Sequence, residues 1–156
     1  MVEKYPLGRN WSFSTIRDKN NQLSIRYAVH SAAPKGSIKK YLVFLNGRTE
    51  YIEKYSYLPK DFKLPKDFAF LTLDHRGQGA SGGARGHIDS YESFIDDAKI
   101  VIDNVVKDTP YIMVCHSMGG LVGLLGHLNQ TFSAKKLILS SPLLGLPDKP
   151  MPKPLF

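Results

Sequence analysis

Hydrophobic and polar residues alternate along residues 11–30, with a polar turn in the middle at residues 18–21. Alternation with a period of two is typical of a strand that buries one face. Asp, Lys and Asn at the turn favour a tight connection. The pattern therefore predicts an antiparallel hairpin with one buried face, built on the apolar positions Trp11, Phe13, Thr15, Leu23, Ile25, Tyr27 and Val29.

The chain then carries short, uninterrupted apolar runs, which are typical of strands covered on both faces. These runs are Tyr41–Leu45, Phe68–Leu73, Tyr111–Cys115 and Leu137–Leu139. Residues 32–36 are expected to form a loop between the hairpin and the first run.

Apolar residues at helical spacing lie between the runs. The first set predicts a helix that ends at Pro59, the second a helix opened by a capping box at Asp89–Glu92, and the third a helix directly after Ser117. The sets are Tyr51, Tyr55 and Leu58; Tyr91, Phe94, Ile95, Ala98, Ile102 and Val105; and Leu121, Leu124, Leu125 and Leu128.

This order, a hairpin followed by alternating strands and helices, predicts an α/β fold with a mostly parallel sheet and flanking helices. Residues 1–141 are expected to form one core unit. Residues 142–156 hold five prolines and no periodic pattern, which favours a semi-rigid connection.

The segment Tyr111–Gly120, YIMVCHSMGG, places Ser117 between a strand end and a helix start. This is the signature of a nucleophile elbow, in which a sharp turn lifts the serine hydroxyl clear of the sheet. The residues two before and two after must be small, as Cys115 and Gly119 are, because strand and helix nearly touch. The alternative is an ordinary turn after a buried strand.

Two further loops follow predicted strands. Asn46-Gly47-Arg48 occupies the position of the loop that gives one backbone N–H to an oxyanion hole, and Met118, after the serine, gives the other. An ordinary Asn-Gly turn is the alternative. Residues 74–82 resemble a phosphate-cradling glycine loop, but they lack the Lys-Ser/Thr ending and a following helix, so a nucleotide site is not expected.

Composition narrows the function classes further. The 156 residues carry a net charge of +7, which favours anionic partners, but the lysines are scattered and no nucleic-acid-binding motif is present. The single cysteine fits a reducing compartment, and no segment has the length and apolarity of a membrane span. No histidine or acid cluster has metal-ligand spacing, so neither a metal nor another cofactor is expected.

Four blocks together resemble the lysophospholipase and monoacylglycerol lipase branch of the α/β-hydrolases, most of all the bacterial membrane-associated lysophospholipases. They are LNGRTEYIEKY (45–55), DHRGQGASGG with RGHIDSY (74–91), CHSMGGL (115–121) and LILSSPLLGL (137–146). The family leads into its lid after the last block. The resemblance therefore implies the N-terminal portion of an α/β-hydrolase fold, lacking the lid and the last strands.

The resemblance implies that Ser117 is the nucleophile, that Met118 and Arg48 are the oxyanion donors, and that Glu50 shapes their loop. Cys115 replaces the usual glycine, and Asn46 replaces the histidine common in monoacylglycerol lipases, which favours the lysophospholipase side. The Arg48 side chain is expected either to reach a substrate phosphate at the pocket mouth or to fold back onto Glu50.

The remaining histidines are not expected to serve as the catalytic base. His116 at the elbow is expected to pack beside the nucleophile. His75 and His87 are expected to make structural hydrogen bonds, and His127 lies too far along its helix. In this fold the acid and the base follow the serine on later loops, so this chain alone is expected to lack them.

The sequence therefore predicts a serine hydrolase of lipid-like carboxylic esters, either lysophospholipids or monoacylglycerols. Its expected location is the cytoplasm, with peripheral contact to the inner membrane and no nucleic-acid partner. A different esterase or aminopeptidase of the same fold is one alternative. A non-catalytic module that kept the fold is the other.

Overall fold

The computed structural model describes residues 8, 10–87 and 90–145, in which six strands and three α-helices follow one another with two short 3₁₀ turns. In chain order these are β1 (Trp11–Arg17), β2 (Ser24–Ser31), η2 (Lys35–Ser37), β3 (Lys40–Leu45), η3 (Ile52–Tyr55), α1 (Leu58–Asp61), β4 (Phe68–Leu73), α2 (Glu92–Val105), β5 (Tyr111–His116), α3 (Met118–Leu128) and β6 (Leu137–Ser140).

The strands form one sheet in the order β1-β2-β4-β3-β5-β6. β1 pairs antiparallel with β2, and β2 with β4, whereas β3 runs parallel to both β4 and β5, and β5 parallel to β6. The predicted hairpin and mostly parallel sheet are confirmed. β6 is an edge strand of this sheet, and Ile138 on it is 49% exposed.

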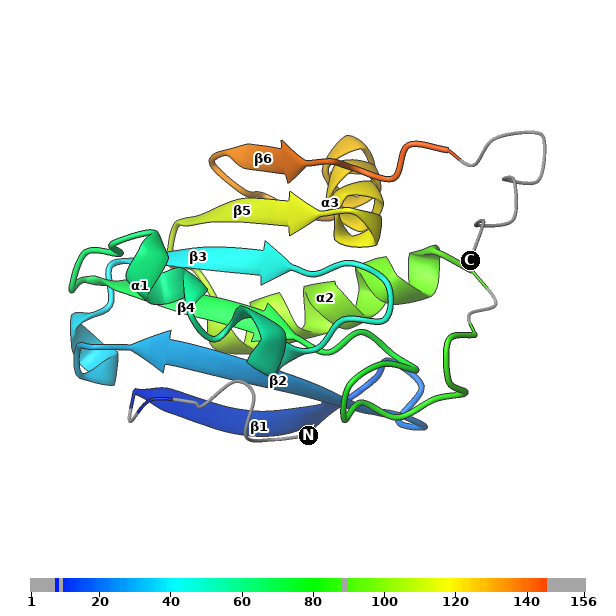
Figure 1. Cartoon of the computed structure of the whole chain (residues 1–156), viewed down its shortest axis with the longest axis horizontal. Helices are drawn as coiled ribbons and strands as arrows, with labels where there is room; N and C mark the ends of the chain where they lie inside the picture. The colour runs from blue at the N-terminus through cyan, green and yellow to red at the C-terminus, as the bar shows by residue number, and fades with distance from the viewer. Residues whose placement is uncertain (1–7, 9, 88–89, 146–156) are drawn as a thin grey trace, which may run out of the picture.

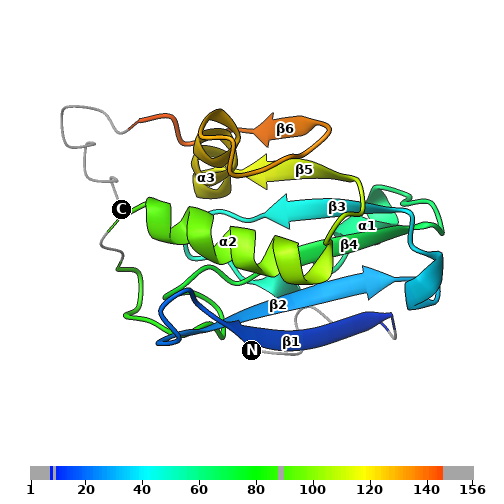
Figure 2. The same cartoon turned by 180° about the vertical axis from the view of Figure 1, so that it is seen from behind.

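The sheet lies between two unequal layers (Figures 1 and 2). The helices α2 and α3 cover one face, whereas η3 and α1 lie over part of the other. The larger core cluster joins α2 and α3 to the sheet, and the smaller one packs Tyr55 of η3 against Phe44 and Phe70. Because both layers press on it, β3 is buried over residues 41–45, as its uninterrupted apolar run predicts.

The hairpin differs from its prediction in which strand is buried. β1 is mostly exposed, and Phe13 on it is 39% exposed. In β2, by contrast, Ile25 and Ala28 lie on opposite faces and both are fully buried. The reason is position, since β1 forms the edge of the sheet whereas β2 pairs with a strand on each side.

Two predicted local features need correction. The segment around Tyr51, Tyr55 and Leu58 is not one helix but the turn η3 followed by the short helix α1. Pro59 does not end a helix; it lies in the first turn of α1, where its missing N–H has no helical partner to lose. The loop expected at residues 32–36 runs into the 3₁₀ turn η2.

α2 begins at Glu92, but its N-cap is Tyr91, which makes no side-chain cap hydrogen bond, so the predicted capping box is not seen among the described residues. The Glu92 N–H donates to the Ser90 hydroxyl at 3.2 Å, whereas Asp89 is not among the described residues. Most of the proline-rich stretch, residues 146–156, also lies outside them.

α3 turns a different face to the sheet than its leucines suggest. Its buried residues are Met118, Gly119, Gly120, Val122, Gly123 and Gly126, whereas the four leucines are only partly buried or exposed. Leu128 is 65% exposed. Gly119 and Gly123 lie too close to β3 and β5 for larger side chains, whereas Gly120 and Gly126 leave room for Pro142 and Phe132.

In the part of the chain that the structure describes, no helix has the length and apolarity needed to cross a bilayer.

Candidate active site at the carboxyl end of the sheet

The predicted site residues lie together at one edge of the sheet. β3, β4 and β5 are parallel, so the segments that follow them, beginning at Asn46, Asp74 and Ser117, leave the sheet at the same edge. Figure 1 shows these connections beyond the arrowheads of the three strands. Ligands in open α/β sheets bind at this edge.

Ser117 adopts the strained backbone expected of an elbow. Its φ is 53° and its ψ is −118°, a combination that L-residues with a Cβ rarely adopt. Neighbouring elements fix this conformation, since the Ser117 N–H donates to the Ser140 carbonyl at 3.1 Å and the Leu143 N–H donates to the Ser117 carbonyl at 2.9 Å. β6 and the segment after it therefore hold the turn from outside.

Small residues on both sides of Ser117 meet close neighbours. A Cβ added at Gly119 would lie 2.3 Å from the Leu45 carbonyl oxygen and 2.5 Å from that of Asn46. A Cβ at Gly123 would lie 2.5 Å from the Cys115 sulfur, so Cys115 packs against a glycine of α3. Burial raises the pKa of Cys115 to about 12, which keeps the thiol protonated as a small apolar filler.

The loop after β3 lies directly beside the elbow. A Cβ added at Gly47 would come within 3.1 Å of the Ser117 Cβ and 2.8 Å of the Glu50 carboxylate. The Asn46 side-chain amide donates to the Leu73 carbonyl at 3.1 Å, which ties the loop to β4. The structure thus brings the predicted oxyanion loop and the predicted nucleophile together.

Glu50 anchors this loop from within. Its carboxylate accepts hydrogen bonds from the Gly47 N–H and the Tyr55 hydroxyl, both at 2.6 Å, and from the Lys54 ammonium at 2.5 Å. Burial opposes ionisation of Glu50, but the three hydrogen bonds outweigh it and lower the pKa of its carboxyl. Tyr55, which the sequence assigned only to a helix face, is therefore part of the loop's support.

The Arg48 side chain does not fold back onto Glu50. Lys54 is the basic partner of that carboxylate, and the Arg48 guanidinium makes no ion pair with any described residue. The backbone N–H groups of Arg48 and Met118 likewise donate to no acceptor within residues 8, 10–87 and 90–145. Arg48, which follows Gly47, and Met118, which follows Ser117, thus each keep a backbone donor without a described acceptor.

Arg48 and Met118 both line a cavity of about 270 Å³. None of the described residues that line it carries a carboxylate, and the guanidinium of Arg76 is paired with Asp97 through hydrogen bonds of 2.7 and 2.6 Å. The sequence did not predict most of the residues that line this cavity. Tyr91 and Phe94, for example, were expected only to belong to the apolar face of a helix. The lining is Arg48, Arg76, Gln78, Gly86, His87, Tyr91, Phe94, Met118 and Leu143.

No described histidine contacts the Ser117 hydroxyl, which makes no hydrogen bond with a described residue. His116 has its Nδ1 atom 3.2 Å from the Ser140 carbonyl, and His127 is exposed at the end of α3. His75 is fully buried edge-on to Phe94, and burial lowers its pKa to about 4. Neither ring nitrogen of His75 makes a well-formed hydrogen bond with a described residue, although a contact with the Asn46 backbone partly offsets the fall in its pKa.

No group of three metal-ligating side chains occurs among the described residues.

Curated proteins of similar sequence are lipid hydrolases. The chain is 31% identical over 152 residues to the probable lysophospholipase L2 of Haemophilus influenzae, covering 94% of this chain and 48% of that protein. It is 30% identical over 114 residues to the monoglyceride lipase of Rattus norvegicus, covering 71% of this chain and 37% of the lipase. The chain thus spans about half the length of such relatives, or less.

Solved structures share the fold. A thermostable carboxyl esterase from Bacillus coagulans superposes with a TM-score of 0.66 over 85% of this chain and 44% of the esterase, at 17% identity. The family model described as serine aminopeptidase, S33 (Hydrolase_4) matches residues 36–156. With the elbow, the adjacent loop and the parallel sheet, these matches show that the chain belongs to this family of α/β-hydrolases.

Proposed function

We propose that the protein is a serine hydrolase of lysophospholipids, in which Ser117 forms an acyl-enzyme. The observation that carries this proposal is the conformation of Ser117, held at a φ of 53° directly beside the loop of Gly47. A strained nucleophile next to unoccupied backbone donors is the arrangement that acyl transfer requires.

In the proposed reaction the Ser117 oxygen attacks the ester carbonyl carbon. The negative charge that develops on the carbonyl oxygen is stabilised by the N–H groups of Arg48 and Met118. Collapse of the tetrahedral intermediate breaks the ester C–O bond, releases the alcohol and leaves an acyl-serine, which water then hydrolyses.

The serine proton needs a general base, which in this fold follows the nucleophile on a later loop, held by an acid. We expect both groups outside this chain. The 156-residue chain by itself should then show no sustained ester turnover, since a serine hydroxyl without a base is a weak nucleophile.

The proposed substrate class rests on the charge beside the site. Arg48 lines the cavity, and its guanidinium has no ion pair with a described residue; a phosphate would supply one through charge-assisted hydrogen bonds. A lipid phosphate brings the substrate from a membrane surface, and the net charge of +7 favours an anionic one. We therefore extend the proposal to peripheral contact with the cytoplasmic face of the inner membrane.

The test uses the full-length gene product. Ser117→Ala is expected to abolish hydrolysis of lysophosphatidylcholine and labelling by a fluorophosphonate probe, whereas the matched control Ser93→Ala on α2 should leave both unchanged. Loss of a nucleophile ordinarily costs about 10⁶-fold in rate. Turnover by Ser117→Ala within about tenfold of the parent would refute the assignment.

The family model's description makes an aminoacyl p-nitroanilide the second substrate to assay. Cleavage of that amide in preference to lipid esters would replace the lipase proposal with a peptidase.

A further inference from the structure

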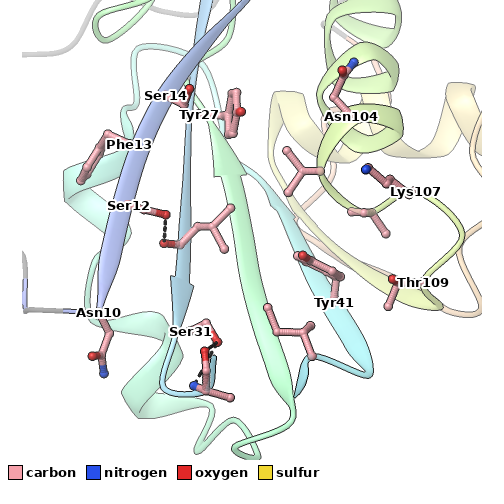
Figure 3. A pocket seen from close by; sticks show the side chains of 15 residues that line it. Asn10, Ser12, Phe13, Ser14, Tyr27, Ser31, Tyr41, Asn104, Lys107 and Thr109 are labelled. Carbon is pink, nitrogen blue, oxygen red and sulfur yellow. Dashed lines mark hydrogen bonds between the residues drawn. The ribbon is translucent and has the colours of Figure 1, made fainter. Parts of the chain in front are cut away.

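A second cleft lies at the other end of the molecule from Ser117. It has a volume of about 570 Å³, within the range of ligand pockets, which runs from about 300 to 1,000 Å³. Its walls are the hairpin strands on one side and the end of α2 on the other, as Figure 3 shows. Tyr41, at the start of β3, lies between them, whereas Asn46 of the candidate site follows the end of that strand.

The charge on the residues that line the cleft is of one sign. Among the described residues that line the cleft there is no carboxylate, and Lys107 is the one cation. The other walls divide into hydroxyl or amide side chains and apolar ones. The polar set is Asn10, Ser12, Ser14, Tyr27, Ser31, Tyr41, Asn104 and Thr109, and the apolar set is Phe13, Val29, Ala33, Ile38, Val105 and Val106. An anion with an apolar body fits this combination.

Tyr41 supplies a hydroxyl donor that has no partner among the described residues and lines the cleft. The residue is only 6% exposed, and its hydroxyl makes no hydrogen bond with any residue that the structure describes. Figure 3 shows its ring in the space between the sheet and α2. Burial raises the pKa of this phenol, so it keeps its proton and donates. The hydroxyl is not one of the enclosed polar atoms that lack a partner, so it is open to the cleft and can donate to a ligand oxygen there.

Lys107 faces Tyr41 across the cleft from a backbone position that suits glycine. It follows α2 with a φ of 54°, and its N–H donates to the Ile102 carbonyl at 3.3 Å, as the residue after a helix often does. A lysine tolerates this left-handed conformation less well than glycine. Its ammonium forms no ion pair with a described residue, and in Figure 3 it points from the helix end toward the sheet.

We propose that this cleft binds a small amphiphilic carboxylate, such as a medium-chain fatty acid. The Lys107 ammonium and the Tyr41 hydroxyl would hold the carboxylate, and Val29, Val105 and Val106 would contact the alkyl chain. The proposal depends only on the lining of this cleft, so it stands or falls separately from catalysis at Ser117.

The test is calorimetric titration of the full-length gene product with octanoate. Octanol, which lacks the charge, and acetate, which lacks the chain, are each expected to bind at least about tenfold more weakly. Lys107→Gly removes the ammonium while relieving the backbone, and should weaken octanoate about tenfold without lowering the urea midpoint. Tyr41→Phe should weaken it about fivefold.

Lys66→Gln is the matched control, because Lys66 is exposed and does not line the cleft. It should leave octanoate binding unchanged. The proposal is overturned by absence of saturable octanoate binding, by equal affinity for octanol, or by undiminished affinity in Lys107→Gly. An equal loss in Lys66→Gln would show general charge attraction and overturn it as well.

Discussion

The strain at Ser117 can be measured as a difference between two variants that both lack the hydroxyl. Ser117 has φ 53° and ψ −118°, where a residue with a Cβ is strained by about 1–3 kcal/mol. Glycine escapes that strain, but its greater freedom in the unfolded chain lowers the free energy of unfolding by about 0.4–1 kcal/mol. The strain term is the larger. Ser117→Gly should therefore be more stable than Ser117→Ala by about 1 kcal/mol.

Urea unfolding of the two variants, followed by fluorescence of the single tryptophan, gives this difference directly. Trp11 packs edge-on to Phe70 at 5.8 Å between ring centres, so its emission reports tertiary structure. The control pair is Ser93→Gly and Ser93→Ala on α2, where glycine should be the less stable by about 1 kcal/mol. If Ser117→Gly is no more stable than Ser117→Ala, the elbow is not strained and the reasoning fails.

Three further outcomes follow from measured contacts. Gly119→Ala should lower the free energy of unfolding by about 3 kcal/mol, because its Cβ would meet the Leu45 carbonyl at 2.3 Å; an unchanged urea midpoint contradicts this. Arg48→Met should lower kcat/KM for a lysophospholipid about tenfold more than for a monoacylglycerol with the same acyl chain; equal losses would argue against phosphate recognition. His75 stays neutral when folded, its pKa lowered by burial from 6.5 to about 4, so its contribution is complete above pH 6.5 and is lost as pH falls toward 4. Between pH 7 and 5 the free energy of unfolding should fall more for the wild type than for His75→Gln. Equal falls would show that His75 is not the group responsible. Glu50, whose pKa is lowered, stays ionised in this range and does not contribute.

Local sequence determined the elements and the turn at Ser117. The four apolar runs all became strands, but only β3 and β4 are buried on both faces, whereas burial alternates along β5 and the edge strand β6 is partly exposed. A strand followed at once by a helix leaves one residue for the turn. Gly119 was identifiable for the same reason, since the contact that excludes a side chain lies between adjacent elements. The prediction that this chain holds a mostly parallel sheet also needed only the order of the elements.

Tertiary structure decided which faces are buried and which side chains meet. Periodicity places apolar residues on one side of an element but carries no information on how closely the next layer approaches. The leucines of α3 therefore suggested its packing face, whereas the close approach of the sheet requires glycine at Gly119 and Gly123. The same limit explains β1, which lies at the edge of the sheet and is mostly exposed in the described part of the chain.

Contacts between residues that are far apart in the sequence were the hardest to predict from the sequence. Glu50 gains Tyr55 as a partner through the bend between η3 and β3, and Lys107 comes to face Tyr41 only because α2 ends over the start of β3. Such contacts depend on how whole helices and strands are placed relative to one another in the fold. Several basic residues near Glu50 in the sequence could have been its ion-pair partner. Only the folded chain shows that Lys54 takes this place and that Arg48 has no ion pair with a described residue.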